Sequence, residues 1–126
     1  PVVEAGGSRR RGIPGPDRVS GGAGRIGKRM SHNPIVGLLQ LDIHVPGACS
    51  LKDKRKHLKS FRDGLRSRFN VSVAEVGEAD QWQRIHLAVT MVSNEEKHVL
   101  ETFDRAVALV ARDTEVEILA KQVDIF

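Results

Sequence analysis

Apolar residues alternate with polar ones from Ile35 to Val45, so that Leu39, Leu41 and Ile43 fall on one side of the segment. A period of two residues predicts a β-strand with one buried face. Similar patterns predict a strand at about 71–76, whose core face is ambiguous, and another at 84–92. A last strand is expected at 115–123, and the side chains expected to turn inward there are those of Val116, Ile118 and Ala120.

Two segments have apolar residues at helical spacing instead. In the first, Ser50 can act as the N-cap and the helix is expected to run to about Arg68. Its expected core residues are Leu51, Leu58, Phe61, Leu65 and Phe69. In the second, Ser93 and Glu96 have the spacing of a capping box, and the helix is expected to end near Arg112. Its expected core residues are Val99, Phe103, Ala106, Val107 and Val110.

The predicted elements follow in the order βαββαβ. Because parallel crossovers are right-handed, the first two strands become parallel with room for the third between them. This predicts an α+β, ferredoxin-like fold: a four-stranded antiparallel sheet in strand order 4-1-3-2, with both helices on one face.

Residues 1–33 differ in composition from the rest of the chain. They hold eight of the 12 glycines and three of the five prolines, with seven basic and two acidic residues. They show no helical or strand period, so we expect a disordered basic tail preceding one domain at 34–126. Translation is expected to begin naturally at Met30, which would make the tail an extension; the alternative is a tail that holds nucleic acid.

The remaining composition restricts the possible chemistry. The single cysteine, Cys49, fits a reducing compartment and hence a cytoplasmic location, and no apolar run is long enough to cross a membrane. No pattern indicates a catalytic nucleophile, a metal site or a small-molecule cofactor. One weaker alternative is that His44, His86 and Asp42 lie together on the helix-free sheet face and bind a metal or transfer protons.

The first predicted helix carries the clearest functional pattern. Its basic residues recur at three- and four-residue spacing and form a stripe of like charges, which costs about 1–3 kcal/mol at low salt. Such repulsion favours an anionic partner, although a solvated helix face is the simpler alternative. The amides of 47–50, just before the helix, are expected to help hold phosphate. The stripe consists of Lys52, Arg55, Lys56, Lys59, Arg62 and Arg66.

Two other surfaces are candidates for partner binding. Val36, Leu38 and Val92 are expected on the helix-free sheet face, where an apolar patch would suit a homodimer or a protein partner. Trp82 falls in the loop between the second and third predicted strands. There it either packs over a sheet edge or contacts a base or a partner.

Several segments resemble the YlxP-like family of small bacterial proteins. They are Val-Gly-Leu-Leu at 36–39, Pro-Gly-Ala-Cys-Ser-Leu-Lys-Asp-Lys-Arg at 46–55, Arg-Phe-Asn-Val-Ser-Val-Ala-Glu-Val at 68–76, Trp-Gln-Arg at 82–84 and Val-Ser-Asn at 92–94. The resemblance implies a ferredoxin-like fold and a role near translation or ribosome maturation, because genes of the family often lie beside those for such factors. Lys52, Lys54 and Arg55 match the basic motif of the family, which adds Lys54 to the candidate binding residues.

The sequence therefore predicts a non-enzymatic cytoplasmic protein that binds ribosomal RNA or a ribosome-associated complex through its first helix. A protein–protein adaptor or homodimer that uses the helix-free sheet face is the first alternative. An acylphosphatase-like enzyme is the second, although no matching arginine and asparagine pair is identified.

Overall fold

A computed structural model of the chain describes residues 3–10, 32–77 and 79–126. Seven elements follow one another along these residues, and the helices begin and end close to their predicted positions. In chain order they are β1 (Val3–Arg10), β2 (Ile35–His44), α2 (Leu51–Arg68), β3 (Ser72–Glu75), β4 (Arg84–Ser93), α3 (Glu96–Ala111) and β5 (Glu117–Ile125).

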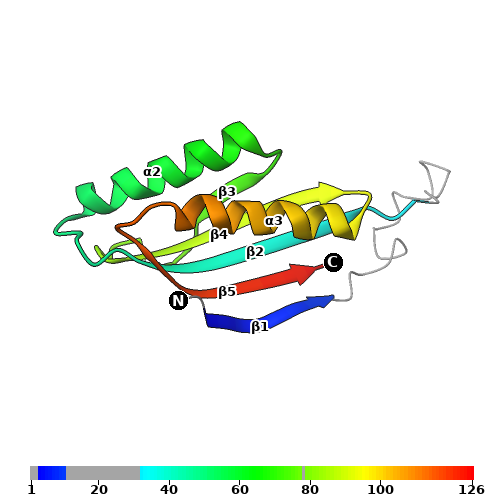
Figure 1. Cartoon of the computed structure of the whole chain (residues 1–126), viewed down its shortest axis with the longest axis horizontal. Helices are drawn as coiled ribbons and strands as arrows, with labels where there is room; N and C mark the ends of the chain where they lie inside the picture. The colour runs from blue at the N-terminus through cyan, green and yellow to red at the C-terminus, as the bar shows by residue number, and fades with distance from the viewer. Residues whose placement is uncertain (1–2, 11–31, 78) are drawn as a thin grey trace, which may run out of the picture.

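The strands form one sheet in the order β1-β5-β2-β4-β3. β2 pairs antiparallel with both β4 and β5, and β3 pairs antiparallel with β4. Both helices lie over the same face of this sheet (Figure 1). The four strands predicted from the sequence therefore have the predicted order, and the ferredoxin-like α+β arrangement is confirmed.

Strand β1, which the sequence analysis does not predict, corrects the prediction that residues 1–33 lack regular structure. Residues 3–10 form β1, which pairs in parallel with the outer edge of β5. Strand pairing uses main-chain N–H and C=O groups, so a segment without an apolar period can still add to an open sheet edge. Residues 11–31, including Met30, lie outside the described residues.

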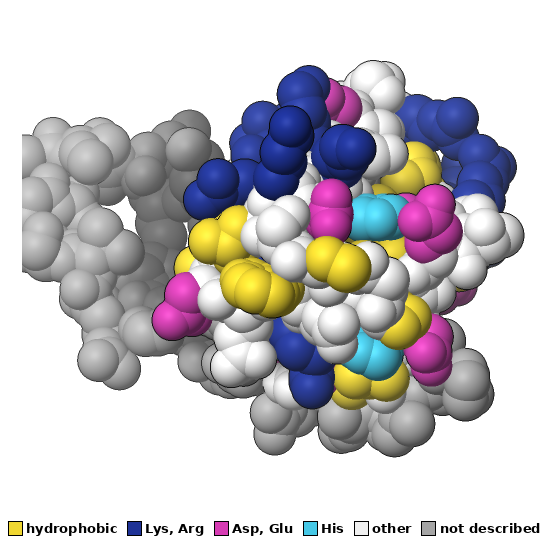
Figure 2. Space-filling view, turned by 90° about the vertical axis from the view of Figure 1, so that its left-hand side faces the viewer, with side chains coloured by type: hydrophobic (Ala, Val, Ile, Leu, Met, Phe, Trp, Pro, Cys, Tyr) yellow, Lys and Arg dark blue, Asp and Glu magenta, His cyan; other side chains and the backbone are white. Residues whose placement is uncertain are grey.

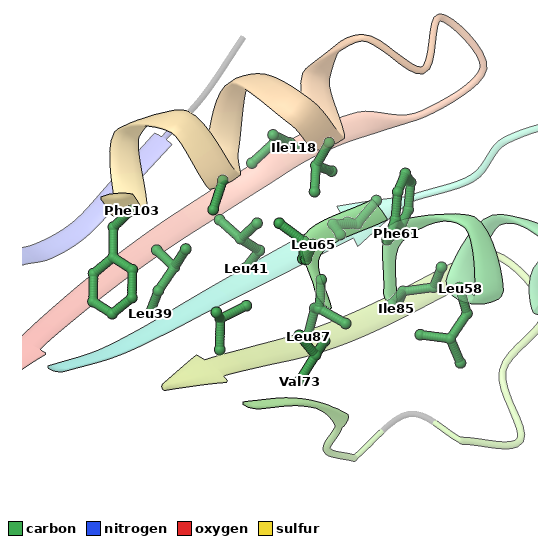
Figure 3. Packing of buried hydrophobic residues seen from close by; sticks show 14 of the residues in the cluster. Leu39, Leu41, Leu58, Phe61, Leu65, Val73, Ile85, Leu87, Phe103 and Ile118 are labelled. Atoms are coloured by element: carbon green, nitrogen blue, oxygen red, sulfur yellow. The ribbon is translucent and has the colours of Figure 1, made fainter. Parts of the chain in front are cut away.

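The core fills the space between the sheet and the two helices. Leu39, Leu41 and Ile43 on β2 are completely buried, as are Ile85 and Leu87 on the neighbouring β4. Figure 3 shows four of these residues, Leu39, Leu41, Ile85 and Leu87, on the side of the sheet that faces the helices, together with Phe61 and Leu65 of α2 and Phe103 of α3. The strict alternation along the two central strands thus produces a single apolar layer under the helices.

Two local details differ from the sequence-based prediction. Ser93 is not the N-cap of α3; Glu95 occupies that position, and the Ser93 hydroxyl accepts a hydrogen bond from the Glu95 amide at 3.1 Å. In β5, Ile118 pairs with Ile43 and Ala120 with Asp42, so one extra residue interrupts the register. This β-bulge turns Ala120 to the helix-free face. The inward positions beyond it belong to Lys121, Val123 and Ile125, of which Val123 and Ile125 are buried.

Gly64 lies inside α2, where glycine weakens a helix. A Cβ atom at this position would lie 3.4 Å from Leu109 Cδ2 of α3, an ordinary contact distance. We expect Gly64→Ala to raise the free energy of unfolding by about 0.5–1 kcal/mol, because alanine has the higher helix propensity. Urea unfolding followed by circular dichroism measures this change. A loss of stability would show that Leu109 cannot adjust to the added methyl group.

Candidate nucleic-acid interface

Helix α2 separates its apolar and basic residues onto opposite sides. Leu58, Phe61 and Leu65 are buried against the sheet. Five of the six residues of the predicted basic stripe are exposed, and Arg62 is half-buried. Lys and Arg side chains gather along one margin of the end of the molecule drawn in Figure 2. We call the set the α2 basic face: Lys52, Arg55, Lys56, Lys59, Arg62 and Arg66.

Lys54 does not belong to this face, which corrects the prediction made from the family resemblance. Lys54 is 1% exposed, and its Nζ lies 2.8 Å from Glu75 Oε2 on β3. The same Nζ donates a hydrogen bond to the Ala79 carbonyl at 3.3 Å. With 3.6 residues per turn, Lys54 points about 200° around the helix from Lys52, toward the sheet. Its role is structural, as a buried ion pair.

Among the described residues, carboxylates neutralise only part of the α2 basic face. Lys59 pairs with Asp63 at 2.7 Å, one turn further along the helix. Within residues 32–77 and 79–126, no carboxylate makes an ion pair with Lys52, Arg55 or Lys56. Most of the positive charge on this helix therefore faces solvent.

Asp63 reports the electrostatic character of this surface. Its pKa is lowered, first by the hydrogen bond from Lys59 and then by the positive charges of Lys59, Arg62 and Arg66. Slight burial opposes this effect. A carboxyl group whose charged form is favoured in this way lies in a positive potential, the same potential that attracts phosphate.

The N-terminus of α2 is already capped by the protein itself. The Ser50 hydroxyl accepts from the Asp53 amide at 3.2 Å, as predicted, and the Asp53 carboxylate accepts from the Cys49 amide at 2.9 Å. The Ala48 amide is bonded to the Val45 carbonyl. The prediction that the amides of 47–50 hold phosphate is therefore wrong for Ala48 and Cys49, whose amides are already bonded within the chain, and the Asp53 carboxylate would repel an anion there.

A polar hollow of about 460 Å³ lies beside this capped end, at the boundary of α2 and the loop that precedes β5. His57 lies at its wall, with Nδ1 2.6 Å from Asp113 Oδ2 and Nε2 3.9 Å from Glu115 Oε2. Figure 2 shows acidic and histidine side chains below the Lys and Arg side chains at this end. No sequence pattern indicates this contact, since 56 positions separate His57 from Asp113.

On the helix-free face, Asp42 lies directly across from His86 on β4, with His44 two residues along β2, but each of the three side chains contacts a different partner. Arg84 makes two hydrogen bonds to the Asp42 carboxylate, the longer at 3.2 Å. His86 Nε2 contacts Gln40 Oε1 at 3.0 Å, and His44 lies 3.6 Å from Glu117. In the described part of the chain, no group of three or more histidine, cysteine, aspartate or glutamate residues is arranged to hold a metal ion.

The apolar candidates on the same face are only partly exposed. Val36 and Leu38 are half-buried, whereas Val92, which pairs with Val36 across the strands, is 63% exposed. Trp82 lies elsewhere, in the loop between β3 and β4, and is 53% exposed. The structure thus brings Val36 and Val92 together but leaves Trp82 apart from them.

The fold and this helix face define a small ferredoxin-like protein with one strongly basic helix. Residues 36–123 match the family described as Protein of unknown function (DUF503), and the chain belongs to this family. It is 30% identical over 83 residues to the Uncharacterized protein YlxP of Bacillus subtilis (strain 168), which covers 66% of this chain and 90% of the relative. The YlxP-like resemblance is therefore confirmed.

Two solved structures resemble the chain in outline. The de novo designed protein Foldit4 matches with a TM-score of 0.45 at 11% identity, over 75% of this chain and 97% of that protein. A C-terminal segment of the alpha subunit of aIF2 from Pyrococcus abyssi matches with a TM-score of 0.47 at 15% identity, over 68% of this chain and 49% of that one. Among the helices described, none is long and apolar enough to span a membrane.

Proposed function

We propose that this protein binds RNA through the α2 basic face, as a non-enzymatic accessory of the ribosome or of a ribosome-associated complex in the cytoplasm. The supporting observation is the distribution of charge in the domain. Residues 51–68 contain eight basic and two acidic residues, whereas the rest of 34–126 contains five basic and 12 acidic residues. The positive charge is therefore concentrated on α2, although the domain as a whole has a net charge of −1.

Such a face recognises the phosphate backbone rather than base sequence. Lysine and arginine side chains that neutralise phosphates release counterions, so affinity falls steeply as salt increases. Contacts of this kind position the protein on the nucleic acid and carry no sequence information. RNA binding is thus expected to be strong at low salt and to depend little on sequence.

Charge reversal on α2 tests the proposal. We expect Lys56→Glu together with Lys59→Glu to weaken binding of a ribosomal RNA fragment at least tenfold at low salt, and to reduce the slope of log affinity against log salt. Fluorescence anisotropy with labelled RNA measures both quantities, and sedimentation with ribosomal subunits across a salt series extends them to the ribosome.

One matched variant controls for net charge, and a second variant tests the opposite change on α2. Lys97→Glu with Arg105→Glu makes the same charge change on α3, and it should leave affinity nearly unchanged. Asp63→Asn removes the carboxylate within the α2 basic face and should strengthen binding by about twofold to threefold. Equal losses from the α2 and α3 reversals would place the binding elsewhere, and no effect from either would contradict the proposal.

The adaptor or homodimer remains a second candidate, favoured by the 63% exposure of Val92 on the helix-free face. An apolar interface predicts association that depends on protein concentration and survives moderate salt. Analytical ultracentrifugation without RNA, at low and at moderate salt, separates this behaviour from electrostatic RNA binding.

A further inference from the structure

The loop between β3 and β4 is fixed against the start of α2. Gln83 Nε2 donates hydrogen bonds to the carbonyls of Pro46 and Ala48, both at 3.2 Å, and the Gln83 carbonyl accepts from the Val45 amide at 2.9 Å. At the other end of the loop, buried Lys54 donates to the Ala79 carbonyl. Residues 79–83 of the loop are therefore held at both ends, next to the first turn of α2.

Trp82 is exposed at the surface of this braced loop. It is 53% exposed and does not belong to the apolar core. A shallow hollow of about 440 Å³ is lined by Asp80, Gln81, Trp82 and Gln83. The hollow thus places an aromatic ring beside the Gln81 amide and the Asp80 carboxylate, which can hydrogen-bond to the edge of a nucleobase.

The loop and the adjacent start of α2 carry charges of opposite sign. Asp80 beside Trp82 disfavours phosphate at the loop, whereas Lys52 and Arg55 in the first turns of α2 favour it. An RNA strand whose phosphates lie on α2 can therefore present a base, rather than its backbone, to Trp82. Aromatic side chains stack on unpaired bases in this way in many single-strand binding proteins.

We infer that Trp82 stacks on an unpaired base of an RNA whose phosphates lie on the α2 basic face. The inference rests on the proposed function and adds a substrate class to it. The preferred ligand is a single-stranded or looped RNA rather than a continuous duplex, in which bases are already stacked.

The chain supplies its own spectroscopic probe for this contact. Trp82 is the only tryptophan in the sequence, which contains no tyrosine, so the intrinsic fluorescence excited at tryptophan wavelengths comes from this residue. We expect a single-stranded oligoribonucleotide to quench this fluorescence as it binds. The same sequence as a duplex should bind α2 without quenching.

Substitution of Trp82 then measures the energetic contribution. Trp82→Ala is expected to weaken single-strand binding, followed by anisotropy, by about fivefold to a hundredfold and to leave duplex binding unchanged. Trp82→Phe keeps an aromatic surface and should restore most of the affinity. The Lys56→Glu and Lys59→Glu variant should weaken binding of both RNAs.

The outcomes separate this inference from the proposed function. Saturable binding of the single strand without quenching, or unchanged binding by Trp82→Ala, would overturn stacking while leaving electrostatic binding by α2 intact. Failure of both RNAs to bind at low salt would overturn the proposed function, and the inference with it.

Discussion

Replacing Lys54 with methionine should lower the free energy of unfolding by about 3 kcal/mol, because it leaves the Glu75 carboxylate without its cation in a largely buried site. The Lys54 side chain is 2% exposed and that of Glu75 is 17% exposed, and their charged atoms lie 2.8 Å apart. Methionine fills nearly the same volume, so the loss comes from charge and from the hydrogen bond to Ala79. Urea unfolding followed by circular dichroism measures the effect.

A double-mutant cycle identifies the cause of this loss. Changing both residues, as Lys54→Met with Glu75→Met, should recover most of the stability, since two apolar side chains leave no buried charge unpaired. Lys52→Met is the matched control, because it removes the same charge two residues earlier at an exposed position. It should change stability by no more than about 0.5 kcal/mol.

Two results of the cycle would contradict this explanation. If Lys54→Met and Lys52→Met have equal effects, the buried ion pair does not stabilise the fold. If the double variant is less stable than Lys54→Met alone, the loss arises from packing or from the contact with Ala79, and the interpretation based on unpaired charge is wrong.

The fold was predictable because its strongest signals are local. Alternation places Leu39, Leu41 and Ile43 on one face of β2 whatever the neighbours of that strand are, and right-handed crossovers leave few orders for the strands. The same reasoning located the exposed stripe of α2, since residues such as Lys52, Lys56 and Lys59 share a helix face through spacing alone.

The wrong predictions concern residues whose contacts are determined by tertiary structure. The family motif groups Lys54 with Lys52 and Arg55, although the helical period directs Lys54 toward Glu75. Asp53 accepts a hydrogen bond from the Cys49 amide, one of the amides predicted to hold phosphate, because a carboxylate of the same chain competes without any cost of association. Neither outcome follows from residue type, but the rotation of Lys54 could have been predicted from helix geometry.

Some contacts between residues distant in sequence cannot be predicted from local patterns. The pairing of His57 with Asp113 depends on how α2 and the loop before β5 meet, and the bulge in β5 depends on its register with β2. The pairing of β1 with β5 uses main-chain groups, which leave no mark on side-chain periodicity.

Gly37 marks the closest approach of α3 to the sheet, and replacing it with alanine should lower the free energy of unfolding by about 2–3 kcal/mol. A Cβ atom at Gly37 would lie 2.8 Å from Phe103 Cε2 and closer still to Val99 Cγ1. Both side chains are almost completely buried and cannot swing into solvent. The Gly37 carbonyl also accepts a hydrogen bond from the Thr90 hydroxyl at 2.7 Å, which holds β2 in place.

Gly47→Ala provides the control, because nothing lies within 4 Å of a Cβ atom at that glycine. It should leave stability within about 0.5 kcal/mol of the parent protein in the same urea measurement. Adding Val99→Ala to Gly37→Ala opens the space that the new methyl group needs, so the two losses should sum to clearly more than the loss of the double variant. Strictly additive losses would show that the destabilisation at Gly37 comes from the backbone of β2 and not from contact with α3.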